Sequence, residues 1–201
     1  MDIKIPSQSN GYQTRMDLFL KKKSANAETP TARPTQLINI YCDGSTYHNG
    51  KPYASGGIGI YFAPNDPKNV SEPFTEDIPT NQRTELYALI RTLMIVDTMI
   101  QDNPTIHYQF HIYTDSQYSL DCVTKWIPGW KKNNWITAQQ RPVKNRQLIE
   151  QLDSLYTKHK RQVYLHHIDG HTDNGDAHSR GNAEADLLAK QGSQQHPKYH
   201  H

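Results

Sequence analysis

The chain has 201 residues, of which 35% are apolar and 21% are charged, and its formal net charge is +2. This near-neutral balance excludes a polycation, so contact with a nucleic acid would need a local basic patch. No apolar run reaches the length of a membrane span, and the first residues lack a signal-peptide core. The two cysteines, Cys42 and Cys122, have no metal-ligand spacing. We therefore expect reduced thiols in an intracellular protein, cytoplasmic or nuclear and not secreted.

Composition separates the first 36 residues from the rest of the chain. They hold few large apolar side chains and end in SANAETPTARPTQ, so residues 1–36 are predicted to be a disordered tail and linker. From Leu37 onward apolar runs recur, and residues 37–193 are predicted to be one folded domain, since roughly 160 residues can bury a core. Residues 194–201 would be a short C-terminal tail.

Three strand patterns open the domain. Apolar and β-branched residues predict strands at 36–42, 56–64 and 70–78, which would form an antiparallel meander with the third strand at an edge. Residues 84–100 then change to a helical period, with apolar side chains at Leu86, Leu89, Ile90, Leu93, Val96 and Ile100. This predicts an amphipathic helix that covers a sheet.

Helix and strand patterns alternate through the rest of the domain. Strands are predicted at 106–115 and 162–169, and helices at 116–127, 145–159 and 181–192, with Gly192 as the stop of the last helix. The order predicts an α/β protein with a five-stranded mixed sheet, three antiparallel strands and then parallel ones, flanked by helices on both faces.

Four acidic residues fall where such a sheet would bring them together. Asp43 and Asp115 end strands, Glu85 opens a helix, and Asp186 lies on the last helix. Open α/β sheets bind ligands at the carboxyl ends of their strands. Four carboxylates in one cleft would repel one another, and a hard divalent cation such as Mg²⁺ relieves that repulsion. Each acid alone could be a turn or capping residue, but the four together favour a metal site.

The segments that carry these acids are IYCDGS, TNQRTELYAL, IYTDSQY and GNAEADLLA. In this order they resemble the four signature blocks of type 1 ribonuclease H, over about residues 37–193. The resemblance implies a ribonuclease H-like fold and an endoribonuclease that hydrolyses the RNA strand of RNA–DNA hybrids, for example in primer or R-loop removal during replication. It implies two Mg²⁺ ions, with Mn²⁺ as a possible substitute, bound by Asp43, Glu85, Asp115 and Asp186. Products would carry 5′-phosphate and 3′-hydroxyl ends.

A histidine follows the last predicted strand in GHTDNGDAHSRGNAEAD, residues 170–186. The resemblance implies a mobile catalytic histidine at the position of His171, which would transfer a proton or aid product release. His178 is nearer to Asp186 in the sequence and is the alternative. We expect no zinc site, because these histidines show no recognised zinc spacing.

Tryptophan and lysine alternate in KWIPGWKKNNW, residues 125–135. Aromatic rings contact sugars and bases, and lysines bind phosphates. The segment resembles the basic protrusion of cellular type 1 enzymes, whose counterparts here are Trp126, Trp130, Lys131, Lys132 and Trp135. The resemblance places Trp126 on the deoxyriboses of the DNA strand. Trp126 and Trp130 could instead anchor the segment to the core, whereas the other three are expected at the surface.

The resemblance also implies that Thr80 and Asn145 bind a phosphate of the DNA strand. Asn81 and Gln82 would contact base edges or 2′-hydroxyls, and they could also cap the helix that starts near Thr84. Some relatives have an arginine two residues before the threonine, where this chain has Ile78. Phosphate binding here is therefore weaker or uses another residue.

The tail contains GYQTRMDLFLKKK, residues 11–23. Gln13, Met16, Phe19 and Leu20 have a spacing that resembles the motif by which replication proteins dock on the sliding clamp, PCNA. One helical turn would present the three apolar side chains as a plug. Leu20 replaces the usual second aromatic, and the stretch could instead fold back on the domain.

Two other interpretations stay open. One is a catalytically inactive hybrid-binding module, which the presence of all four acids argues against. The other is the ribonuclease H part of a reverse transcriptase, which the opening Met and the absence of an upstream polymerase sequence disfavour. We expect a monomer.

Overall fold

The computed structural model of the chain describes residues 35–170 and 175–198. The predicted clamp-binding residues and His171 lie outside these ranges, so their roles stay predictions, as do the domain boundaries. Within the described ranges, no helix has the length and apolar character needed to cross a membrane.

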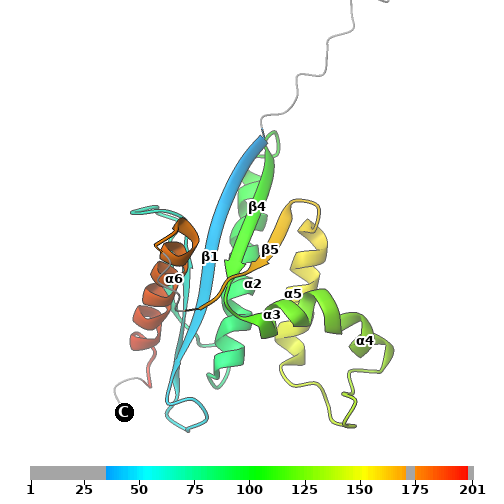
Figure 1. The fold of residues 1–201 in the computed structure, drawn as a ribbon. Helices are drawn as coiled ribbons and strands as arrows, with labels where there is room; N and C mark the ends of the chain where they lie inside the picture. Colours follow the sequence, from blue (N-terminus) through cyan, green and yellow to red (C-terminus); the bar gives the residue numbers. More distant parts are fainter. Residues whose placement is uncertain (1–34, 171–174, 199–201) are drawn as a thin grey trace, which may run out of the picture. The chain divides into compact units, whose positions relative to one another are not determined.

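Five strands form one mixed sheet in the order β3-β2-β1-β4-β5 (Figure 1). The strands are β1 (Thr35–Tyr47), β2 (Ser55–Tyr61), β3 (Val70–Pro73), β4 (His107–Thr114) and β5 (Val163–His167). The β1–β2 and β2–β3 pairs are antiparallel, and the β1–β4 and β4–β5 pairs are parallel. The predicted five-stranded mixed sheet, with its third strand at an edge, is confirmed.

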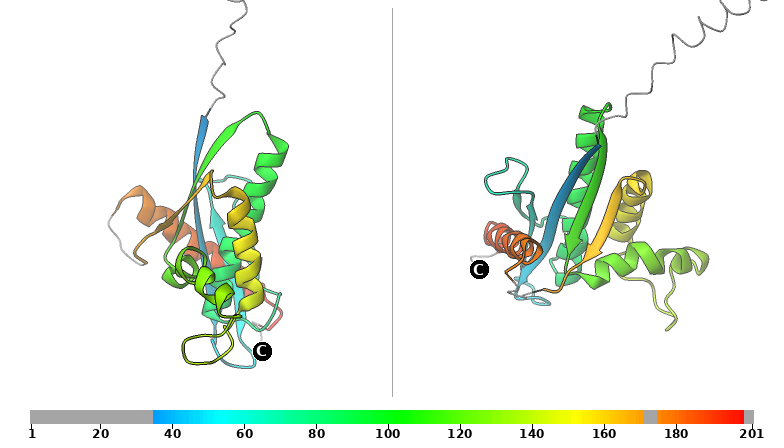
Figure 2. Two further views of the ribbon diagram at one scale, coloured as in Figure 1. Left: turned by 90° about the vertical axis from the view of Figure 1, so that its right-hand side faces the viewer. Right: turned by 45° about the horizontal axis from the view of Figure 1, so that its top comes forward.

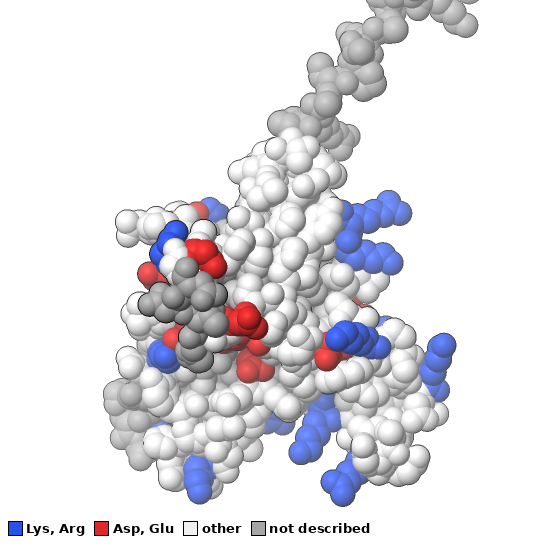
Figure 3. Space-filling view, in the orientation of Figure 1, with Lys and Arg blue, Asp and Glu red and all other residues white. Residues whose placement is uncertain are grey.

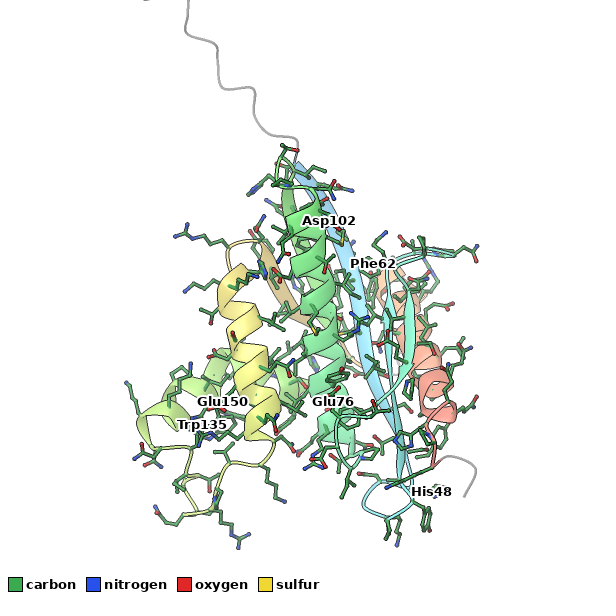
Figure 4. The ribbon with its side chains drawn as sticks, turned by 180° about the vertical axis from the view of Figure 1, so that it is seen from behind. His48, Phe62, Glu76, Asp102, Trp135 and Glu150 are labelled. Carbon is green, nitrogen blue, oxygen red and sulfur yellow. The ribbon has the colours of Figure 1, made fainter. Side chains whose placement is uncertain are left out.

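Helices cover both faces of the sheet. They are α2 (Asn81–Asp102), α5 (Arg146–His159) and α6 (Ala177–Gln194). Helices α2 and α5 lie together on one face, as the view from behind shows (Figure 4), and α6 lies on the other face against β1, β2 and β3 (Figure 2). Between β4 and α5 the chain runs through α3 (Gln117–Asp121), the π-helical turn η1 (Cys122–Trp126) and α4 (Ile127–Lys132).

The main core fills the space between the sheet and α2. Alternate side chains of β4 point into it, and Tyr108, Phe110 and Ile112 are all buried. From α2 the predicted apolar stripe supplies Leu86, Leu89, Ile90, Leu93 and Val96, each with 0% exposed surface. Burying such side chains contributes about 1.5–3 kcal/mol each relative to exposing them, so this face of α2 fixes the helix on the sheet.

Two helices begin earlier than the apolar pattern predicts. Helix α2 starts at Asn81, because the side chain of Thr80 accepts a hydrogen bond from the backbone N–H of Arg83 at 3.3 Å. Asn81 and Gln82 are thus the first residues of the helix, and the prediction that they cap it is wrong. Helix α6 starts at Ala177, where Asp176 is the capping residue.

Gly192 does not end the last helix. It is buried inside α6, and a Cβ there would lie 2.4 Å from the carbonyl oxygen of Glu72 on β3. The prediction of a glycine stop is therefore wrong. Gly192 is instead the point at which α6 approaches the backbone of the edge strand.

Candidate active site

Parallel pairing of β1 and β4 places two of the four acids side by side. Tyr41 is paired with Tyr113 in the parallel register, and Asp43 and Asp115 each follow two residues later. Because successive residues on a strand alternate between faces, both carboxylates share the face of the tyrosines. The parallel register therefore brings Asp43 and Asp115 to the same end of the β1–β4 pair.

A glycine brings the third acid to Asp43. A Cβ on Gly44 would lie 2.2 Å from the carbonyl carbon of Thr84 and 2.3 Å from the nitrogen of Glu85. No side chain fits there, so β1 touches the first turn of α2 and Glu85 lies beside the strand. The hydroxyl of Ser116 donates a hydrogen bond of 2.6 Å to Oε2 of Glu85, which orients this carboxylate.

A second glycine brings the fourth acid. Gly59 on β2 is the pairing partner of Asp43, and a Cβ on Gly59 would lie 2.0 Å from the carbonyl oxygen of Ala185. The backbone of α6 thus rests directly on β2, and Asp186 comes next to the sheet. The ammonium of Lys190 donates to Oδ2 of Asp186 at 2.6 Å and partly neutralises it.

The charges of the other three acids act on the carboxyl of Asp43. The pKa of Asp43 is raised to about 8, first by burial and then by the negative charges of Asp115, Asp186 and Glu85. Burial and the charge of Asp115 also raise the pKa of Glu85, while the hydrogen bond from Ser116 opposes that rise. The space-filling view shows acidic side chains gathered where β1, β4 and α6 meet, with basic side chains toward α4 (Figure 3).

The residues of this cluster fit a hard divalent cation. Their donors are carboxylate oxygens, which Mg²⁺ prefers. The amide nitrogen of Asn182 lies 3.4 Å from Oδ2 of Asp115, and its oxygen is buried with no hydrogen-bond partner among the described residues. Within the same part of the chain no group of three or more His, Cys, Asp or Glu side chains is arranged so that it could hold a metal ion by itself. Mg²⁺ sites typically take water and substrate oxygens as their remaining ligands, so the protein need not supply every ligand itself.

His178, the alternative mobile histidine, lies in the first turn of α6. Its Nδ1 is 3.1 Å from the hydroxyl of Tyr41, and its ring packs on Tyr113 with centroids 4.4 Å apart. Tyr41 is buried under Gly181 of the same helix. This packing fixes His178 on the sheet, which disfavours a role that requires movement.

The residues predicted to bind a DNA-strand phosphate line one surface pocket. Thr80 and Asn145 are on its wall, together with the predicted Asn81 and Gln82. The pocket also includes Asn49, Arg83 and Lys144, which the sequence analysis did not assign. Two of them could have been identified from their neighbours in the sequence, because Arg83 lies within TNQRTEL and Lys144 directly precedes Asn145.

The three tryptophans of the basic segment differ in exposure. Trp126 is 39% exposed, as a substrate contact requires, and Trp130 is half-buried between the other two rings. Trp135 is only 7% exposed, so the prediction that it lies at the surface is wrong. Its carbonyl accepts a hydrogen bond from Val143, and the guanidinium of Arg146 lies 4.9 Å from its ring centroid (Figure 4). Trp135 therefore anchors the segment to the start of α5.

The two lysines of the segment are exposed, as predicted. Lys131 forms an ion pair with Asp153 of α5, whereas Lys132 lies at the end of α4. Trp126 at the end of η1 and these lysines at the end of α4 are thus exposed on one short segment.

The sheet order and the acids at its centre define an α/β protein of the ribonuclease H-like fold. The RNase H family model matches residues 35–194. Ribonuclease H of Schizosaccharomyces pombe is 34% identical over 185 residues, which cover 92% of this chain and 63% of that protein. Ribonuclease H of Nitrosomonas eutropha is 40% identical over 156 residues, covering 77% of this chain and 88% of that protein. The chain belongs to the type 1 ribonuclease H family.

A solved structure shows the same fold within a larger protein. A mutant of the prototype foamy virus protease–reverse transcriptase is similar with a TM-score of 0.59 at 27% identity, over 83% of this chain and 22% of that one. The matched part is thus about a fifth of that viral protein.

Proposed function

We propose that this protein is an endoribonuclease that hydrolyses the RNA strand of RNA–DNA hybrids with the help of divalent cations, Mg²⁺ or Mn²⁺. The observation that carries the proposal is the convergence of Asp43, Glu85, Asp115 and Asp186 at one end of the β1–β4 pair, with the pKa of Asp43 raised to about 8. Removal of primers or R-loops is the cellular role that such an activity would serve.

The four acids would hold two ions, which when bound supply charge neutralisation and Lewis-acid activation at a phosphodiester. Asp43, whose pKa is raised by the charges of the other three acids, would be the central ligand of these ions. Glu85 is held by Ser116 at 2.6 Å, which would keep its carboxylate directed toward the RNA 2′-hydroxyl. Products with 5′-phosphate and 3′-hydroxyl ends are expected.

Other parts of the chain would hold the substrate. Thr80 and Asn145 line the pocket proposed for a DNA-strand phosphate, and Asn81 and Gln82 line the same pocket. Trp126 would pack on deoxyriboses, where a 2′-hydroxyl would clash. Contacts of these two kinds distinguish the two strands of a hybrid by their sugars.

The proposal is tested by cleavage of an end-labelled RNA–DNA hybrid. We expect cleavage of the RNA strand in Mg²⁺, none in excess EDTA, and full recovery when Mg²⁺ is added back. Duplex DNA of the same sequence is the control and should stay intact. Binding of the hybrid without cleavage in either Mg²⁺ or Mn²⁺ would contradict the proposal and favour an inactive binding module.

His171→Ala is expected to slow cleavage severalfold, because His171 would move a proton or assist product release beside the metals. His178→Ala should have a smaller effect, since His178 is hydrogen-bonded to Tyr41 in the first turn of α6. Single-turnover and steady-state rates of both variants check this. A larger loss in His178→Ala would transfer the role to that residue.

A further inference from the structure

Arg83 joins the two sides of the proposed phosphate pocket. Its Nε donates to Oδ1 of Asn145 at 3.1 Å, and its Nη1 donates to the carbonyl oxygen of Ile78 at 2.8 Å. Its Nη2 forms an ion pair with Oδ2 of Asp77 at 3.0 Å. One guanidinium thus contacts the start of α5, the loop before α2 and an acidic side chain at the same time.

The three partners of Arg83 differ in how easily another anion could replace them. Asn145 is half-buried and also donates to the hydroxyl of Tyr118 at 3.3 Å. The partner at Ile78 is a backbone carbonyl. Asp77 is the exposed partner, with 55% of its side chain accessible, against 26% for Arg83. An ion pair this exposed contributes little to stability, so another anion can replace Asp77 at little cost.

The charge of the pocket also depends on Arg83. The side chain of Ile78, two residues before Thr80, is 56% exposed and carries no charge. Among the described residues that line the pocket, the cationic ones are Arg83 and Lys144. A guanidinium binds phosphate oxygens through two parallel hydrogen bonds, whereas lysine acts as a single point charge. Arg83, which its hydrogen bonds to Asn145 and Ile78 hold in place, is therefore the cation of this pocket best suited to bind a phosphate.

We propose that Arg83 is the phosphate-binding cation of this pocket and that Asp77 competes with the substrate's phosphodiester for it. The inference rests on the proposed function, because the phosphodiester is that of the DNA strand in a hybrid. In the free protein Asp77 occupies Nη2 of Arg83, and a bound phosphate displaces it while Asn145 and the Ile78 carbonyl keep the guanidinium in place. Asp77 thereby sets the affinity for the substrate without touching the acids that would hold the metals.

The test is the binding of a fluorescently labelled RNA–DNA hybrid, measured by anisotropy in EDTA at low salt, where no cleavage occurs. Asp77→Asn should tighten binding about two- to fivefold, the range that corresponds to loss of an exposed ion pair. The matched control is Glu72→Gln. Glu72 of β3 forms an ion pair of 3.1 Å with Arg91, which lies on α2 as Arg83 does, and its exposure is similar to that of Asp77. Glu72 lies outside the pocket, so this variant removes one negative charge and should leave binding unchanged.

A double-mutant cycle assigns the effect to Arg83. Arg83→Met should weaken binding, and Asp77→Asn should give no gain in the Arg83→Met background. In Mg²⁺, Asp77→Asn should lower KM and leave kcat unchanged. Binding by Asp77→Asn that equals the wild type, or a gain that persists without Arg83, overturns the inference. If the wild type cleaves the hybrid, either of these two results overturns only the role of Asp77 and leaves the proposed function intact. If the wild type does not cleave the hybrid, the proposed function is overturned, and anisotropy still tests the role of Asp77.

Discussion

Asp43→Asn is expected to reduce cleavage of an RNA–DNA hybrid by roughly a thousandfold or more, the scale of losing an essential catalytic group. Asp43 is the acid on which the charges of Asp115, Asp186 and Glu85 converge, so its carboxylate is central to any bound cation. Asparagine keeps the size of the side chain and removes its charge. Cleavage rates in Mg²⁺ measure the effect, and isothermal titration with Mg²⁺ should show weakened binding.

The same substitution should stabilise the protein in the absence of divalent cations. The pKa of Asp43 is 3.8 in an unperturbed chain and about 8 in the folded protein. Between these values the folded state keeps a proton that the unfolded state releases, so stability falls as the pH rises from about 4 to about 8. Thermal unfolding in EDTA should therefore show a larger loss of Tm between pH 5 and pH 8 in the wild type than in Asp43→Asn. An equal loss in both proteins would show that Asp43 ionises without cost.

Gly44→Ala is the second substitution with a large expected effect, on stability as well as activity. The new Cβ would meet the backbone of Thr84 and Glu85 at 2.2–2.3 Å. Strand β1 and helix α2 must then separate, at a cost of about 1–3 kcal/mol or more. The separation also moves Asp43 away from Glu85, so we expect a large loss of cleavage in the fraction that remains folded.

Gly129→Ala is the control for this prediction. Gly129 lies in α4, and an added Cβ would have nothing within 4 Å. Alanine in place of glycine inside a helix stabilises by about 0.5–1 kcal/mol, so this variant should match or exceed the wild-type Tm. Denaturant unfolding of both variants gives the comparison, and an unchanged midpoint for Gly44→Ala would mean that β1 and α2 can separate freely.

The sheet and the acids could be predicted because both depend on local patterns. Alternating apolar residues gave β4 its buried face, and the position of Asp43 and Asp115 after strands placed them at one edge through the parallel register. The contacts that close the site could not be predicted in this way. The approach of α6 to β2 at Gly59 depends on two segments more than a hundred residues apart in the sequence.

The misplaced residues show the same limit. Trp135 looks like a surface aromatic beside lysines, yet it is buried because Arg146 and Val143, which come later in the chain, close over it. The starts of α2 and α6 were placed too late because the capping residues Thr80 and Asp176 precede the apolar stripe by several positions. At these positions, contacts with distant segments and hydrogen bonds at the helix ends determine the structure more than the spacing of apolar residues does.

Strand β2 carries none of the four acids and no residue assigned to the substrate, yet it determines how far Asp186 lies from Asp43. Ala185 and Ser193 of α6 rest against the bare backbone at Gly59 and Gly57. In a complete mutational map scored by activity, β2 should therefore appear as intolerant as the acids themselves. A list of residues chosen only by their contact with the substrate would leave β2 out.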